Sequence, residues 1–270
     1  MAMNLTMRGL MARLSGGLQV AATVAAFMLL WEAAARIFSV PSYILPPPSE
    51  IFAELVKRRV QYANAASFTL RPMLLGFAAA VGIGVALALV VAFSRTMEKT
   101  VYPLLVFFQI VPKIAVAPLF IIWFGFGLMP KVLLVFLLSF FPVVVSAITA
   151  FRSVDTDIMD LARSTGAGRW RIFVRVQVPH ALPTLFTGIK VAAALSATAA
   201  VVAEFVASDR GLGYLLLEAN GNLNTGMAFG SVFVLTALGF ALYAAVEIAE
   251  QFLIPWHVSQ RAHGDVANPI

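Results

Sequence analysis

Six long apolar runs set the strongest limit on how this chain can fold. A helix needs about 20 predominantly apolar residues to cross the hydrocarbon core of a membrane. The runs cover residues 19–38, 70–93, 101–124, 129–151, 182–205 and 229–254. They predict an all-α polytopic membrane protein with about six transmembrane helices in one domain.

The composition agrees with a membrane protein and argues against an ordinary soluble enzyme. Hydrophobic residues make up 61% of the chain and charged residues only 12%, whereas a soluble domain carries about 25% charged residues. The net charge is +6, but the basic residues are spread thinly between the apolar runs, so we expect no nucleic-acid partner. The chain has no cysteine, which excludes disulfides and thiolate metal sites.

The sequence contains no catalytic or cofactor-binding motif. A phosphate-binding loop of the form G-x-x-x-x-G-K-S/T, a metalloprotease H-E-x-x-H and a G-x-S-x-G elbow are all missing. The histidines His180, His257 and His263 are too dispersed to hold a metal ion. We expect no catalytic residue, metal or cofactor in this chain, so that any energised transport would need a partner chain to hydrolyse ATP.

The first apolar run admits two interpretations. Arg8 and Arg13 precede it, and the alanines at 33–35 resemble a signal-peptide cleavage site. We interpret it as an uncleaved anchor because the run continues past Trp31 and further runs follow. The predicted organisation is a cytoplasmic segment at 1–18, a transmembrane domain at 19–254 with a cytoplasmic loop at 152–181, and a cytoplasmic tail at 255–270.

Lysine and arginine predict the orientation, because they favour the cytoplasmic segments of membrane proteins. With a cytoplasmic N-terminus, the inside segments contain Arg8, Arg13, Arg95, Lys99, Arg152, Arg163, Arg169, Arg171, Arg175 and Arg261. The outside segments contain Lys57, Arg58, Arg59, Lys131 and Arg210. We therefore expect both termini in the cytoplasm. The outer cluster at 57–59 lies on a predicted interfacial helix at 48–64.

The second apolar run carries small residues at every fourth position. Gly76, Ala80, Gly84 and Ala88 fall on one face of a helix. Such a stripe lets the backbone of another helix approach closely. It predicts that the helix packs tightly against a neighbour along this face.

The loop between the fourth and fifth runs is predicted to form two short helices around a glycine turn. Asp155 or Thr156 can cap the first helix, whose apolar face is Ile158, Leu161 and Ala162. Gly166 and Gly168 are expected to end the first helix and redirect the chain.

The second helix of the loop presents an aromatic side and a basic side. Trp170, Phe173 and Val174 share one side, Arg171 and Arg175 are one turn apart, and Pro179 is expected to end the helix. A pair of this kind fits a groove on a partner protein and equally well the lipid headgroups.

The spacing of this loop resembles the cytoplasmic signature of the inner-membrane permease subunits of ABC importers. The family pattern is E-A-A, three residues, G, nine residues and I-x-L-P. This chain has D-L-A at 160–162, three residues, Gly166, nine residues and V-Q-V-P at 176–179. The substitutions keep charge or apolar character, although Leu161 is bulkier than Ala, and the spacing is kept.

Other motifs look like the branch that serves uptake of nitrate, sulfonates, taurine and thiamine precursors. They are I-L-P-P-P at 44–48, P-L-F-I-I-W-F-G-F-G at 118–127 and G-L-G-Y at 211–214. The resemblance extends from about residue 45 to 256. It implies the type I ABC importer permease (MetI-like) core, located in a bacterial inner (plasma) membrane.

The resemblance implies that transport requires several different protein chains. Two ABC ATPase subunits would bind ATP and Mg²⁺, a second copy of this chain would complete the pathway, and a periplasmic or extracellular binding protein would deliver the solute. The loop is similar to the coupling helices that sit in a cleft of each ATPase. The residues implied for ATPase coupling are Asp160, Ala162, Arg163, Gly166, Gly168, Arg169 and Trp170.

The third apolar run is the first candidate for the pathway wall. Pro112 and Pro118 interrupt it, so its freed backbone carbonyls need partners or a water-lined cavity. Polar groups at membrane depth usually face protein or a cavity. The tentative pathway residues are Gln109, Lys113, Trp123 and Glu204. As an alternative, Lys113 or Lys190 pairs with Glu204 or lies near the lipid headgroups. Glu32, Glu247 and Glu250 are expected at the membrane interface.

Two other classes of function compete with an importer subunit. An ion-gradient-driven secondary transporter usually shows inverted repeats and midplane carboxylates, whereas this chain shows no repeat and Glu204 lies near the end of a run. A membrane scaffold would have no need for the loop signature. The outer segment at 211–225 is expected either to receive the binding protein or to form a plain re-entrant turn.

Overall fold

The computed structural model describes residues 2–256 of the chain, and this part is helical without strands. The predicted tail beyond residue 256, with His257, Arg261 and His263, lies outside the described residues. The elements are α1 (Ala2–Ile37), α2 (Pro48–Lys57), α3 (Arg59–Phe93), α4 (Arg95–Ile110), η1 (Lys113–Val116), α5 (Ala117–Phe124), α6 (Leu128–Arg152), α7 (Thr156–Ser164), α8 (Arg169–Ile172), η2 (Phe173–Gln177), α9 (Val178–Ala207), α10 (Leu212–Gly221) and α11 (Thr225–Leu253).

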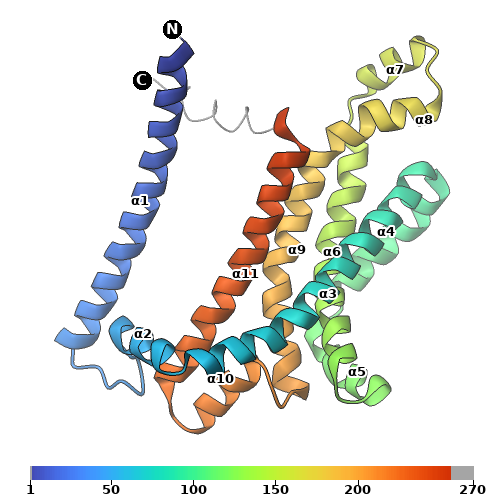
Figure 1. Cartoon of the computed structure of the whole chain (residues 1–270). Helices are drawn as coiled ribbons and strands as arrows, with labels where there is room; N and C mark the ends of the chain where they lie inside the picture. Colours follow the sequence, from blue (N-terminus) through green and yellow to red (C-terminus); the bar gives the residue numbers. More distant parts are fainter. Residues whose placement is uncertain (1, 257–270) are drawn as a thin grey trace.

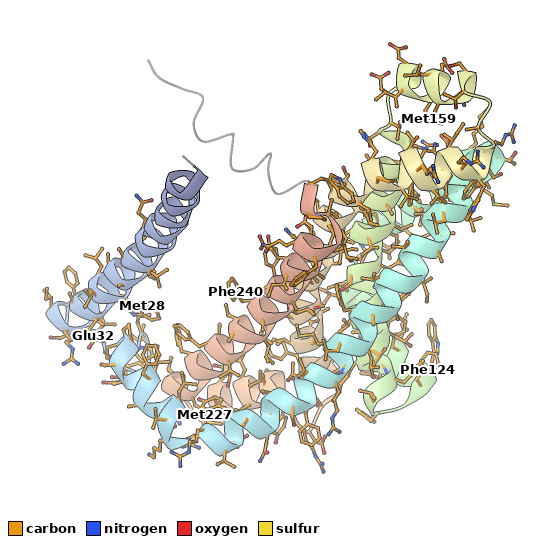
Figure 2. All side chains as sticks on the ribbon, turned by 45° about the horizontal axis from the view of Figure 1, so that its top comes forward. Met28, Glu32, Phe124, Met159, Met227 and Phe240 are labelled. Carbon is orange, nitrogen blue, oxygen red and sulfur yellow. The ribbon has the colours of Figure 1, made fainter. Side chains whose placement is uncertain are left out.

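The long helices run between two ends of the molecule (Figure 1). The start of α1, the α7–α8 pair and the end of α11 lie at one end, whereas α2, α5 and α10 lie at the other. Met159 of α7 and Met227 of α11 mark these two ends in Figure 2. The alternation agrees with the predicted topology, in which the N-terminus and the 152–181 loop share one side.

Four helices within the described residues are long and apolar enough to cross a membrane: 59–93, 128–152, 169–206 and 225–253. The pair formed by 96–110 and 113–124 is bent by 83° and makes a fifth if counted as one broken span. The break at Pro112 is therefore confirmed. The first predicted span lies within α1 and remains a prediction.

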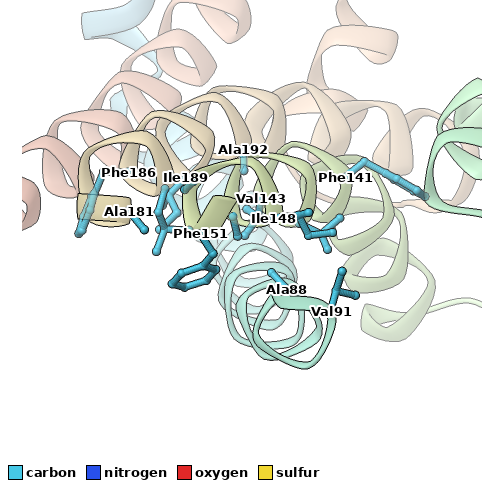
Figure 3. Packing of buried hydrophobic residues seen from close by; sticks show 14 of the residues in the cluster. Ala88, Val91, Phe141, Val143, Ile148, Phe151, Ala181, Phe186, Ile189 and Ala192 are labelled. Carbon is cyan, nitrogen blue, oxygen red and sulfur yellow. The ribbon is translucent and has the colours of Figure 1, made fainter. Parts of the chain in front are cut away.

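The core lies where α6 packs between α3 and α9. Figure 3 shows Ala88 and Val91 of α3 facing Val143 and Ile148 of α6, with Ala192 of α9 behind them. The small-residue stripe of α3 is buried along this contact.

The residues of the stripe are small because the α6 backbone and side chains approach α3 closely there. A Cβ at Gly76 would lie 2.6 Å from the Cβ of Val135, and one at Gly84 would lie 3.0 Å from Cγ1 of Val143. The predicted packing role of the stripe is thus confirmed.

The predicted interfacial helix at 48–64 is divided into two helices. α2 ends at Lys57, Arg58 has φ −107° and ψ 24°, and α3 starts at Arg59. Residues 59–64 therefore begin the long helix α3.

The sequence predicted that the second helix of the loop ends at Pro179, and this prediction is wrong. Helix α8 passes through the π-helical turn η2 into α9, and Pro179 lies in the first turn of α9. The backbone N–H of Val178 donates to the carbonyl of Phe173, five residues back. A π turn widens the helix locally, which accommodates a proline ring that would clash in a regular α-helix interior.

Candidate functional site

Residues 153–177 form a projecting segment, here called the elbow, which contains α7, α8 and η2. The side chain of Asp155 caps α7 by accepting a hydrogen bond from the backbone N–H of Asp157 at 2.8 Å. Gly166 has φ +73°, a conformation that glycine adopts at little cost. Gly168 has φ −63° and ψ 153°, which any residue can adopt. The turn therefore depends on Gly166 alone, whereas both glycines were predicted to be needed.

The tip of the elbow presents large apolar side chains to the outside. Leu161 is 69% exposed and Trp170 is 70% exposed, and Ile158 is also exposed. Burying side chains of this size usually contributes about 1.5–3 kcal/mol each. Leaving several exposed on one projecting segment is typical of a surface that binds a partner.

The base of the elbow is fixed to the bundle by aromatic rings. Phe173 is buried, and its ring centroid lies 4.5 Å from that of Phe93 at the end of α3 and 5.8 Å from that of Phe151 at the end of α6. Trp170 stacks on Phe93 and Phe173 at 6.4 and 5.7 Å. The indole thus contacts the bundle on one side while most of it remains exposed. Sequence reasoning did not identify Phe93 or Phe151, whose only signal was their place at the ends of apolar runs.

Polar contacts complete the elbow. Asp160 pairs with Arg163 at 2.9 Å, and both side chains are exposed. At the base, Arg152 forms an ion pair with Glu98 of α4, and the ring Nε2 of His180 lies 3.2 Å from the carbonyl oxygen of Ser153.

A cavity of about 690 Å³ lies between the elbow and the ends of α3 and α4. Arg163 and Arg169 line it together with Glu98. Of the other residues implied for coupling, Ala162 is half-buried and Gly166 and Gly168 are exposed. The structure therefore gathers the predicted coupling residues on one projecting segment.

The bent span brings two of the predicted pathway residues together. Lys113 Nζ donates to the backbone carbonyl of Gln109 at 2.7 Å and lies 4.7 Å from the ring centroid of Phe141. In an unbroken helix that carbonyl would accept from the backbone N–H of residue 113. The lysine side chain thus satisfies the polar group that the break at Pro112 releases.

The other two pathway candidates lie apart from this pair. Trp123 is exposed on α5 and packs beside Phe120, with ring centroids 6.1 Å apart. Glu204 is only 1% exposed, and its Oε2 accepts a hydrogen bond from the backbone N–H of Gly213 at 2.6 Å. The four residues do not form one cluster.

The predicted pairing of Lys113 or Lys190 with Glu204 is wrong. Lys190 forms an ion pair with Glu250 of α11 and lies 3.9 Å from Glu247. Glu250 is buried in the last turn of α11, so its expected place near the membrane interface stays a prediction. Lys190 and Glu204 are 14 residues apart on one helix, a rise of about 21 Å, which is too far for an ion pair.

The end opposite the elbow carries a groove of about 600 Å³ between α2 and the start of α11. Glu50, Glu54 and Lys57 line one side of it, and Asn222 and Asn224 line the other. This polar groove includes part of the outer segment predicted to receive a binding protein. Among the described residues, no group of three His, Cys, Asp or Glu side chains is placed to hold a metal ion.

The helical bundle has the projecting elbow and the broken span expected of a permease core, and the comparisons with known proteins agree. The family of binding-protein-dependent transport system inner membrane components matches residues 73–257. The chain belongs to this family and is a permease subunit of an ABC importer.

Curated relatives place it in the branch predicted from the motifs. It is 34% identical to the formylaminopyrimidine transport permease protein ThiX of Halalkalibacterium halodurans, over 86% of this chain and 93% of that protein. It is 34% identical to the riboflavin transport system permease protein RibX of Chloroflexus aurantiacus, over 88% and 89%. It is 29% identical to the taurine transport system permease protein TauC of Escherichia coli, over 87% and 88%.

A solved structure shares the fold. The MetNI methionine ABC transporter in an inward-facing conformation matches with a TM-score of 0.59 and 17% identity, over 68% of this chain and 91% of the matched chain. The predicted all-α, MetI-like permease core is confirmed by this match and by the helices of the described region.

Proposed function

We propose that this chain forms the translocation pathway for a small anionic or heterocyclic solute, such as a sulfonate, taurine, nitrate or a thiamine precursor. Two copies would line the pathway, two separate ATPase subunits would bind the elbows, and an external binding protein would deliver the solute to the opposite end. ATP and Mg²⁺ would be held by the ATPases.

The exposed elbow carries this proposal. Leu161 of α7 and Trp170 of α8 are exposed, and these two helices lie at the end of the molecule where α1 begins. Phe173 fixes the base of the elbow to α3 and α6. A partner that binds the tip can therefore displace the ends of the spans. Asp160, Ala162, Arg163 and Arg169 would contribute the polar and small surface around the apolar tip.

The solute class rests on chemistry and on the relatives. Lys113 offers a positive charge beside the bend of the broken span, which suits an anionic solute. Gln109 beside it and Trp123 on α5 would line separate parts of the pathway. The relatives are named for transport of formylaminopyrimidine, riboflavin and taurine.

The same topology supports a bacterial inner-membrane location with both termini and the elbow in the cytoplasm. The elbow and its neighbouring loops contain the arginines that favour the cytoplasmic side.

Reconstitution into lipid vesicles tests the proposal. The chain is purified together with a candidate ATPase and a candidate binding protein. Uptake of a radiolabelled taurine, sulfonate, nitrate or thiamine-precursor panel is measured with ATP inside or outside the vesicles. We expect uptake only with ATP on the elbow side and binding protein on the other. Uptake by the chain alone under a proton or sodium gradient would identify a secondary transporter and overturn the proposal.

A further inference from the structure

Glu204 belongs to a buried contact that the proposed pathway does not use. Its carboxylate lies near the end of α9 and accepts a hydrogen bond from the backbone N–H of Gly213, in the first turn of α10. The first N–H groups of a helix have no partner within that helix and favour a negative charge. Glu204 therefore caps α10 from a different helix.

Two glycines make room for this carboxylate. A Cβ at Gly211, which has φ +110°, would clash with the carboxylate of Glu204. A Cβ at Gly213 would lie 2.8 Å from the Cβ of Glu204 and 2.9 Å from the carbonyl oxygen of Val201. The two glycines of the G-L-G motif at 211–213 thus leave the space that the Glu204 side chain occupies.

A third helix joins the same contact. The hydroxyl oxygen of Thr69, which is fully buried in α3, accepts a hydrogen bond from the backbone N–H of Leu212 at 2.9 Å. Two successive N–H groups of α10 are therefore capped by side chains from α9 and α3. We call Thr69, Glu204 and the 211–213 backbone the tertiary cap.

The position of Glu204 links the tertiary cap to the elbow. One helical segment extends from Arg169 to Val206, so its first residues lie in the elbow and Glu204 lies near its last turn. It is also the most enclosed of the four spans, with 67% of its apolar window buried. This continuous segment gives a displacement of the elbow a direct path to the start of α10.

We propose that Glu204 is a positioning residue that makes the outer segment at 211–225 follow the movement of α9 when the ATPases bind ATP. The inference rests on the proposed function, because it assumes that ATPases move the elbow. Glu204 would thereby pass a movement of the elbow at one end of the permease to the outer segment at the other end.

Fluorescence from a single label tests this coupling. The chain has no cysteine, so an Asn222→Cys variant that is labelled before assembly with the ATPases carries one bimane probe per copy, at an exposed position just after α10. In the assembled complex with ATPase, addition of ATP, Mg²⁺ and vanadate is expected to change the bimane emission. With Glu204→Ala added, we expect most of this change to be lost, while basal ATPase activity stays intact.

Two further variants separate coupling from folding. Glu204→Gln keeps an oxygen that can accept from Gly213 and should retain most of the change, whereas Thr69→Val removes the hydroxyl at nearly constant volume and should reduce it. Ser196→Ala is the matched control, because this buried serine of α9 bonds only to the carbonyl of Ala193 on its own helix in the described contacts. Stimulation of ATPase activity by the binding protein should fall with the fluorescence change.

The outcomes are distinct. An undiminished fluorescence change in Glu204→Ala or, if that variant does not assemble, in Thr69→Val would overturn the role of the tertiary cap. A parent complex that binds the ATPase but shows no nucleotide-dependent change would overturn the inference that the outer segment follows α9, whereas a chain that binds no ATPase would overturn the proposed function itself.

Discussion

Gly166 and Gly168 lie two residues apart in the elbow, but their backbones differ. Gly166 turns the chain at φ +73°, whereas Gly168 is in an extended conformation at the start of α8. A side chain at Gly166 would cost about 1–2 kcal/mol of backbone strain, which is enough to move a short helix such as α7. The pattern predicted a glycine turn correctly, but only the backbone angles identify which glycine makes it.

Gly166→Val is therefore expected to abolish uptake while the protein still inserts into the membrane. The matched variant Gly168→Ala should transport normally, because a Cβ at Gly168 meets nothing within 4 Å. Uptake into vesicles and the amount of ATPase that copurifies are the measurements. Normal uptake and normal ATPase copurification in Gly166→Val would refute the coupling role of the turn.

Among the helical elements, the π turn η2 is a feature that the sequence pattern did not predict. Proline usually ends a helix, and on that basis Pro179 predicted a break. The structure instead keeps the helix continuous, with Phe173 buried between Phe93 and Phe151. This packing depends on the ends of α3 and α6, which are distant in sequence, so the local pattern alone is insufficient to predict it.

The contact between α9 and α11 also depends on tertiary structure. Apolar periodicity predicted both helices, but it does not say which carboxylate faces Lys190. In the structure the side chains of Lys190 and Glu250 are 8% and 4% exposed and form an ion pair. Removing one member of a buried pair leaves the other charge uncompensated in an apolar environment.

Glu250→Gln is expected to destabilise the protein by about 3 kcal/mol, the low end for a broken buried pair, because Glu247 remains 3.9 Å from Lys190. The double variant Lys190→Met, Glu250→Leu should recover most of this loss, since both members of the buried pair are removed and the remaining Glu247 side chain is 37% exposed. Thermal unfolding in detergent measures both. Asp160→Asn, which affects an exposed pair, is the control and should leave the melting temperature unchanged. A double variant as unstable as the single one would show that the loss does not come from the unpaired charge.

At the scale of the whole molecule, the two ends differ in the chemistry that they offer. One end carries the elbow with its arginines and exposed apolar tip. The other carries the polar groove with Glu50, Glu54 and the asparagines of the outer segment. The apolar runs predicted about six crossings, and the described residues contain four spans, or five if the bent pair counts as one. The groove between α2 and the start of α11 required the folded chain, because its two sides are distant in sequence.

The orientation of the two ends is open to a direct test, because the natural chain lacks cysteine. Ser164 in the elbow and Asn222 in the outer segment are both exposed, so Ser164→Cys and Asn222→Cys each place one thiol at one end. Intact cells are treated with a membrane-impermeant maleimide. We expect Asn222→Cys to react at once and Ser164→Cys to react only after the membrane is permeabilised, because the positive residues around the elbow favour the cytoplasm. Labelling of Ser164→Cys in intact cells would place the elbow outside, where no ATPase can reach it, and would overturn the coupling mechanism together with the orientation.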